Sequence, residues 1–155
     1  MALLSRRLIW VVLLVWTASC TSRADIGLVD AALSGDLPKV QTLLEEGANI
    51  EATAYDGLTA LDAAAKRGHL DVLQYLIVRG AAVNGTSSDK RTALGLAAVY
   101  EHTECARFLV SKGGEIRGSA EWKQDLLASL KRDGKDDLYQ IVKDQIDRER
   151  STRHS

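Results

Sequence analysis

The sequence predicts an all-α solenoid of stacked helix pairs, because several sets of residues recur at a spacing of 33 positions. Glycines recur at Gly47, Gly80 and Gly113. In the same frame, alanine pairs recur at Ala31-Ala32, Ala64-Ala65 and Ala97-Ala98. A fixed period of this length is typical of repeat proteins, in which each unit buries its apolar face only against its neighbours. We expect about four units, at residues 27–55, 56–88, 89–121 and 122–149.

Residues 1–19 are interpreted as an export signal that precedes the solenoid. Arg6 and Arg7 come before an apolar run over residues 8–18. The run has the length of the apolar core of a signal peptide and is short for a membrane span. A retained membrane anchor is the alternative interpretation.

The end of this run, Thr17-Ala18-Ser19-Cys20, resembles the lipobox of bacterial lipoproteins, although Thr17 stands where leucine is usual. The resemblance implies that Cys20 is acylated and becomes the mature N-terminus. The alternative is ordinary cleavage after Ala24, which follows the small residue Ser22 at the spacing of a signal-peptidase site. We expect a lipid-anchored protein of the outer membrane, with a linker over residues 20–26.

Start and stop signals divide each unit into two helices. Thr59 and Thr92 are placed to cap the first helix with their hydroxyl groups. Gly68 is placed to end that helix, since glycine adopts the left-handed conformation at little cost. Glu101 holds the corresponding position one unit later, so we expect strain or a longer turn there. The second helix is predicted by an apolar stripe of 3.6-residue period, formed by Val72, Leu73, Leu76 and Ile77.

Residues 56–84, with the sequence DGLTALDAAAKRGHLDVLQYLIVRGAAVN, resemble an ankyrin repeat. The next unit repeats the pattern, and the first unit shows mainly its second half. The family's Thr-Pro-Leu-His stands as Thr-Ala-Leu-Asp from Thr59 and as Thr-Ala-Leu-Gly from Thr92. Gly95 therefore lies inside a helix, where glycine costs about 1 kcal/mol relative to alanine. The resemblance implies helix-turn-helix units joined by short hairpin-like loops.

The last unit is predicted to be a degenerate cap. One apolar stripe is formed by Trp122, Leu126, Leu127 and Leu130, and a second by Leu138, Ile141, Val142 and Ile146. Terminal repeats need a polar outer face to stay soluble, and the residues between these stripes supply it. Residues 150–155 are interpreted as a flexible tail.

The sequence shows no catalytic or metal-binding pattern, so we expect neither enzymatic activity nor a cofactor. His69 and His102 occupy the same position of successive units, which favours a structural role over metal binding. Cys105 corresponds in register to Val72 and is interpreted as a small buried hydrophobic residue. The formal net charge is −1, and it becomes −3 when Arg6 and Arg7 leave with the signal. A mildly acidic domain argues against nucleic acid as a partner.

A binding surface is the remaining functional feature. The ankyrin resemblance implies that partners bind a concave face built from the hairpin tips and the first helices. By register, this surface consists of Tyr55, Leu58, Lys66, Arg67, Arg91, Val99 and Tyr100. Tyrosine and arginine are frequent anchors of protein interfaces, whereas ordinary exposure without a partner is the alternative for each residue.

These observations predict a monomeric, non-enzymatic interaction protein of the bacterial envelope that binds another protein. An immunity protein against an envelope-targeted toxin and an accessory factor for a periplasmic enzyme are alternative functions. An enzyme is a further alternative, which the structural explanations available for the polar residues disfavour.

Overall fold

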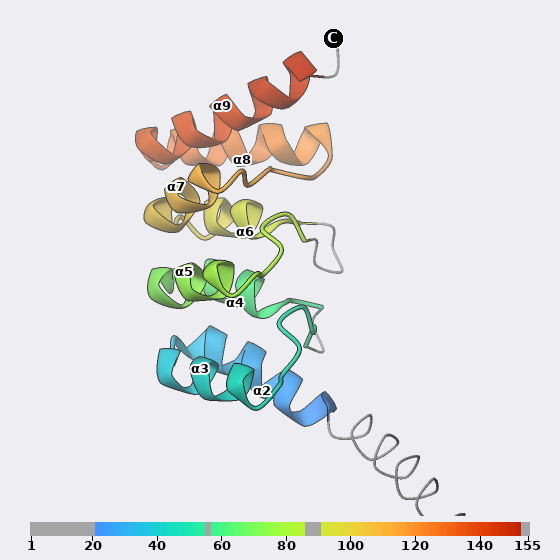
Figure 1. The fold of residues 1–155 in the computed structure, drawn as a ribbon. Coiled ribbons are helices and arrows are strands. Elements are labelled where there is room, and N and C mark those ends of the chain that lie inside the picture. The colour runs from blue at the N-terminus through green and yellow to red at the C-terminus, as the bar shows by residue number, and fades with distance from the viewer. Residues whose placement is uncertain (1–20, 55–56, 86–90, 153–155) are drawn as a thin grey trace, which may run out of the picture.

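The structure, a computed structural model, describes residues 21–54, 57–85 and 91–152. The helices form pairs that are stacked in chain order, from α2 in blue at one end to α9 in red at the other (Figure 1). The pairs are α2 (Thr21–Ser34) with α3 (Leu37–Glu45), α4 (Ala60–Arg67) with α5 (Leu70–Val78), α6 (Ala93–Val99) with α7 (Thr103–Ser111), and α8 (Ala120–Arg132) with α9 (Asp136–Thr152). Within the described residues there is no strand, only an isolated bridge between Thr53 and Thr59. The predicted all-α solenoid is confirmed.

The first helices of the units form one column, in which α2 contacts α4 and α4 contacts α6. The column is close-packed because its shared faces carry alanine, and these residues are at most 1% exposed: Ala31, Ala32, Ala64, Ala65, Ala97 and Ala98. The second helices cover this column with larger side chains. Among them Leu73, Leu76 and Leu109 are fully buried.

Both ends of the array are more helical than the sequence indicated. The predicted linker over residues 20–26 is wrong from Thr21 onward, because residues 21–26 belong to α2. The Oδ1 atom of Asp25 also accepts a hydrogen bond of 2.8 Å from the backbone N–H of Asn49. Likewise, α9 continues to Thr152, so most of the predicted tail from residue 150 is helical. The contact of Asp25 with Asn49 holds the first of these segments, and local sequence does not report such a contact.

The turns between paired helices follow the predicted pattern. Thr59 and Thr92 cap α4 and α6 through their side chains. Gly68 ends α4 with a φ of 76°. Glu101 has a φ of 61° and is the one non-glycine residue with positive φ among the described residues. The expected strain is therefore present, and it costs about 1–2 kcal/mol.

The two repeat histidines connect successive units. Nε2 of His69 lies 3.1 Å from the carbonyl oxygen of Leu33, and Nε2 of His102 lies 3.1 Å from that of Lys66. Each ring also covers the turn glycine of the preceding unit, since a Cβ atom built on Gly68 would lie only 2.5 Å from Nδ1 of His102. These glycines are therefore required for space as well as for conformation.

The third interface between units replaces this contact by an ion pair. Glu101 and Lys135 hold the positions that the glycine and the histidine occupy one unit earlier. The Nζ atom of Lys135 lies 2.9 Å from Oε2 of Glu101. The side chain of Glu101 leaves no room above the turn for an imidazole ring such as that of His102. The long, flexible side chain of Lys135 takes the place of the ring.

Candidate partner-binding surface

The C-terminal ends of α4 and α6 bring four of the predicted surface residues together. Lys66 and Val99 occupy equivalent positions of adjacent units, as do Arg67 and Tyr100. We call these four residues the α4–α6 patch. Since α4 and α6 pack directly against each other, the patch is carried by rigid elements rather than by a loop.

Tyr100 is the most prominent apolar group of the α4–α6 patch. It is 46% exposed, although large apolar side chains in this fold are mostly buried. The Nζ atom of Lys66 lies 5.7 Å from the centroid of its ring, which is within the range of a cation–π contact. Arg67, the residue after Lys66, is exposed, and Val99 is half-buried. The patch therefore combines an accessible aromatic ring with two cations.

Leu58 was predicted to lie on the binding surface, and this prediction is wrong. Its side chain is only 6% exposed. Its carbonyl oxygen accepts a hydrogen bond of 3.0 Å from the backbone N–H of Ala54, which folds the hairpin back before α4 begins. Leu58 also directly precedes the helix-capping Thr59, a position where an apolar residue commonly packs against the first turns of the helix. That capping pattern was the sequence signal for its burial.

Arg91 lies at the junction with the C-terminal unit rather than in the α4–α6 patch. It is half-buried, and its Cζ atom lies 5.6 Å from the centroid of the Trp122 ring. The same ring packs on two glycines: a Cβ atom would lie 3.3 Å from it at Gly95 and 2.4 Å from it at Gly118. The packing of Trp122 therefore explains the glycine inside α6. Arg91 contributes to this junction as well as to the surface.

Two further predicted site residues, Cys20 and Tyr55, lie outside the described residues. The buried position predicted for Cys105 is confirmed, with 1% of the residue exposed. Burial, with smaller contributions from Glu104 and Asp71, raises the pKa of this thiol to about 11. Because the thiolate is the reactive form, we expect Cys105 to react slowly with thiol reagents at neutral pH.

Within the described residues, no group of three or more His, Cys, Asp and Glu side chains is arranged to hold a metal ion. Over the same part of the chain, no helix has both the length and the apolar character of a membrane span.

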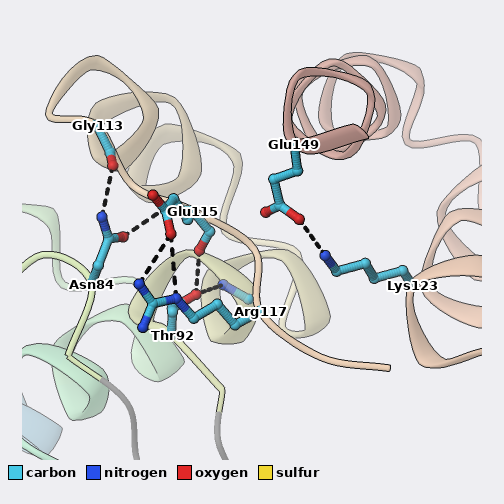
Figure 2. A network of polar contacts seen from close by, with 8 residues as sticks. Asn84, Thr92, Gly113, Glu115, Arg117, Lys123 and Glu149 are labelled. Atoms are coloured by element: carbon cyan, nitrogen blue, oxygen red, sulfur yellow. Dashed lines mark hydrogen bonds and ion pairs between the residues drawn. The ribbon is translucent and has the colours of Figure 1, made fainter. Parts of the chain in front are cut away.

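The hairpins that join the units are held by side chains whose pairing the sequence analysis did not anticipate. Oε1 of Glu51 accepts a hydrogen bond of 2.7 Å from the backbone N–H of Ala82, and Oδ1 of Asn84 accepts one of 2.8 Å from that of Glu115. Figure 2 shows Asn84 bridging the next hairpin, because its amide also donates to the carbonyl oxygen of Gly113 over 2.9 Å. Glu51 and Asn84 are 33 positions apart, so the period of the repeat was the sequence signal that could have predicted their shared role.

Comparison with known proteins agrees with the repeat architecture. The family model for ankyrin repeats (three copies) matches residues 28–119. None of the curated proteins compared with the chain matches it. The matched region contains α3 to α7 and the second half of α2, and it carries every residue of the α4–α6 patch. The chain therefore belongs to the ankyrin-repeat family.

Proposed function

We propose that this protein is a non-enzymatic adaptor that binds a partner protein through the α4–α6 patch. Ankyrin repeats are protein-interaction modules, and the family match covers this patch. The observation that supports the proposal best is the exposed ring of Tyr100 at the end of α6, which Lys66 of the adjacent helix α4 contacts. Aromatic and arginine side chains on a preorganised surface are the usual anchors of protein interfaces.

The charge of the α4–α6 patch indicates what kind of surface it binds. Lys66 and Arg67 are both cationic, and the patch contains no acidic side chain. A partner that presents carboxylates around an apolar contact complements this arrangement. Such complementarity speeds association and excludes wrongly charged partners more than it raises affinity.

Replacing Arg67 and Tyr100 together by alanine is expected to abolish partner capture while leaving the fold intact. Desolvated anchors of these types commonly contribute about 2 kcal/mol or more each, so the pair should weaken binding at least about 100-fold. The measurement is crosslinking in envelope fractions, with the midpoint of thermal unfolding recorded in parallel. The control is Val78→Ala with Arg79→Ala, two exposed residues at the end of α5. Equal capture by the two double variants would place the binding surface elsewhere.

We also propose that residues 1–19 are removed as a signal peptide and that the protein is anchored to the outer membrane through acylated Cys20. The described part of α2 starts at Thr21, so cleavage before Cys20 would leave all of this part in the mature protein. Cleavage after Ala24 would instead remove its first turn. That turn leads to Asp25, whose carboxylate holds the first hairpin at Asn49. Retention of the helical residues before Asp25 favours the lipoprotein interpretation over ordinary secretion.

Labelled palmitate is expected to enter the wild-type protein and to be absent from Cys20→Ser. Cys105→Ser is the matched control and should keep the full label, because the buried thiol with its raised pKa is a poor nucleophile. The readout is autoradiography of the purified protein together with sequencing of its N-terminus. An unlabelled wild-type protein that begins at Asp25 would refute the lipid anchor and leave ordinary secretion.

A further inference from the structure

The hairpin after α5 contains Asn84-Gly85, the only asparagine-glycine pair in the chain. The backbone nitrogen that follows an asparagine can attack the carbon of the side-chain amide, and glycine obstructs this attack least because it has no side chain. The fold also favours glycine here, since a Cβ atom built on Gly85 would lie 3.3 Å from the carbonyl oxygen of Ala82. The turn therefore places a chemically labile pair in the hairpin.

The folded hairpin restrains both groups that would react. The side-chain amide of Asn84 donates over 2.9 Å to the carbonyl oxygen of Gly113, and its Oδ1 atom accepts over 2.8 Å from the backbone N–H of Glu115 (Figure 2). The backbone N–H of Gly85, the attacking group, donates to the carbonyl oxygen of Ala82 over 3.1 Å. The reaction detaches the amide nitrogen of Asn84 and removes the proton of Gly85. The bonds to Gly113 and Ala82 must therefore break before the attack.

The contacts of Asn84 lie at the junction between the third unit and the C-terminal unit. The hairpin that Asn84 holds leads into α8, and Thr92 also donates to the carbonyl oxygen of Glu115 in this hairpin. The first helices of the earlier units pack directly on each other, whereas α8 has no comparable contact with α6 among the described residues. The C-terminal unit is docked instead through α9 on α7 and through the ring of Trp122 on Gly118. Side chains thus carry much of this junction.

We propose that Asn84 is a deamidation site that the folded hairpin protects, and that its conversion loosens the C-terminal unit irreversibly. When the hairpin opens, the backbone nitrogen of Gly85 bonds to Cγ of Asn84. The amide nitrogen leaves as ammonia and takes the proton of Gly85, which gives a cyclic imide. Water then breaks one of the two bonds between the imide nitrogen and a carbonyl carbon. Breaking the bond to Cγ gives aspartate, and breaking the bond to the backbone carbonyl carbon gives isoaspartate, in which the chain runs through the side chain.

Both products weaken the contact with the hairpin after α7. Each carries a carboxyl group in place of the amide, so the donor to the carbonyl oxygen of Gly113 is lost and two acceptors face each other. The aspartate product keeps the acceptor for the backbone N–H of Glu115, the role that Glu51 plays one unit earlier. Isoaspartate lengthens the backbone by a carbon atom and displaces this acceptor as well. Modification therefore acts as a one-way switch on the third junction.

The test is peptide mapping by mass spectrometry while the purified protein is kept in mildly alkaline buffer, because the mass rises when an amide becomes an acid. Asn49 is the only other asparagine and serves as the internal control, since the β-branched side chain of Ile50 obstructs the same attack. In the urea-unfolded chain, Asn84 should react faster than Asn49. In the folded chain, Asn84 should react at least about tenfold more slowly than when unfolded, because the rate follows the population of the open hairpin.

Two glycine variants separate opening of the third junction from unfolding of the whole protein. Gly118→Ala places a Cβ atom 2.4 Å from the ring of Trp122, so it strains the third junction and should accelerate deamidation of Asn84 at least about tenfold. Gly35→Ala is the matched control, because its Cβ atom would lie 2.6 Å from Nδ1 of His69 at the first junction. This control should change the rate less than about twofold.

Asn84→Asp reproduces the aspartate product and tests its effect on the array. Hydrogen exchange should become about fivefold faster in α8 and α9, the change expected for one lost hydrogen bond, and stay unchanged in α2 and α4. Three results would overturn the proposal: equal rates at Asn84 in the folded and unfolded chains, equal acceleration by the two glycine variants, or unchanged exchange in α8 and α9. None of these measurements involves the α4–α6 patch, so their failure is distinguishable from failure of the proposed function.

Discussion

Replacing Gly68 by alanine should destabilise the protein by about 2–4 kcal/mol. The residue has a φ of 76°, where a Cβ atom costs about 1–2 kcal/mol. The new Cβ atom would also lie 2.5 Å from Nδ1 of His102, so the ring must move away. That movement breaks the hydrogen bond from His102 to the carbonyl oxygen of Lys66, worth about 1 kcal/mol. The measurement is urea-induced unfolding followed by far-ultraviolet circular dichroism.

Gly113→Ala is the matched control for this substitution. Gly113 has a φ of 79°, yet no atom beyond its chain neighbours lies within 4 Å of its ideal Cβ position. Only the conformational cost of about 1–2 kcal/mol should therefore remain. In a background of His102→Ala, the cost of Gly68→Ala should fall toward that of the control. Equal costs for the two glycine substitutions in the wild-type background would show that the histidine contact contributes nothing.

Truncating Leu94 to alanine is expected to cost about 2–5 kcal/mol, the range for fully buried leucines. Leu94 is 0% exposed and lies on α6, between the second unit and the C-terminal unit. In a repeat protein, stability is close to a sum of terms within units and between nearest neighbours. A weakened third unit should therefore uncouple the unfolding of the units on either side of it. Unfolding should then no longer be a single transition.

Hydrogen exchange resolved along the chain measures this effect directly. Protection should fall first in α6 and α7, while α2 and α4 stay protected by their own contact. The control is Val78→Ala, since Val78 is 81% exposed and its truncation should change stability by less than about 0.5 kcal/mol. A uniform loss of protection over all helices would contradict the unit-by-unit description and indicate one cooperative core.

Residues with a strictly local role were the most predictable. Thr59 and Gly68 act as the sequence indicated, because a helix cap and a left-handed turn depend on neighbouring backbone alone. The burial of Cys105 was equally predictable from its register with Val72. At Glu101, the same reasoning predicted the strain that the structure shows.

The candidate site was less predictable than the helices that carry it. Register placed Lys66 and Tyr100 on adjacent units, and the structure brings their side chains into contact. Register also predicted that Leu58 lies on this surface, but the structure shows that Leu58 is buried. The 33-residue period indicates which positions of the units are equivalent. The exposure of a hairpin residue depends instead on how the loop turns before the next helix.

The sequence by itself determined the number, order and period of the units, since each stop glycine, capping threonine and alanine face is encoded within one repeat. Only the tertiary structure decided how the units end and what they leave exposed. The ring of Trp122 fills the space above Gly95, Lys135 replaces the third histidine, and half-buried Glu149 pairs with Lys123. Each of these depends on contacts between units, where the nearest neighbour in space lies tens of residues away in the chain.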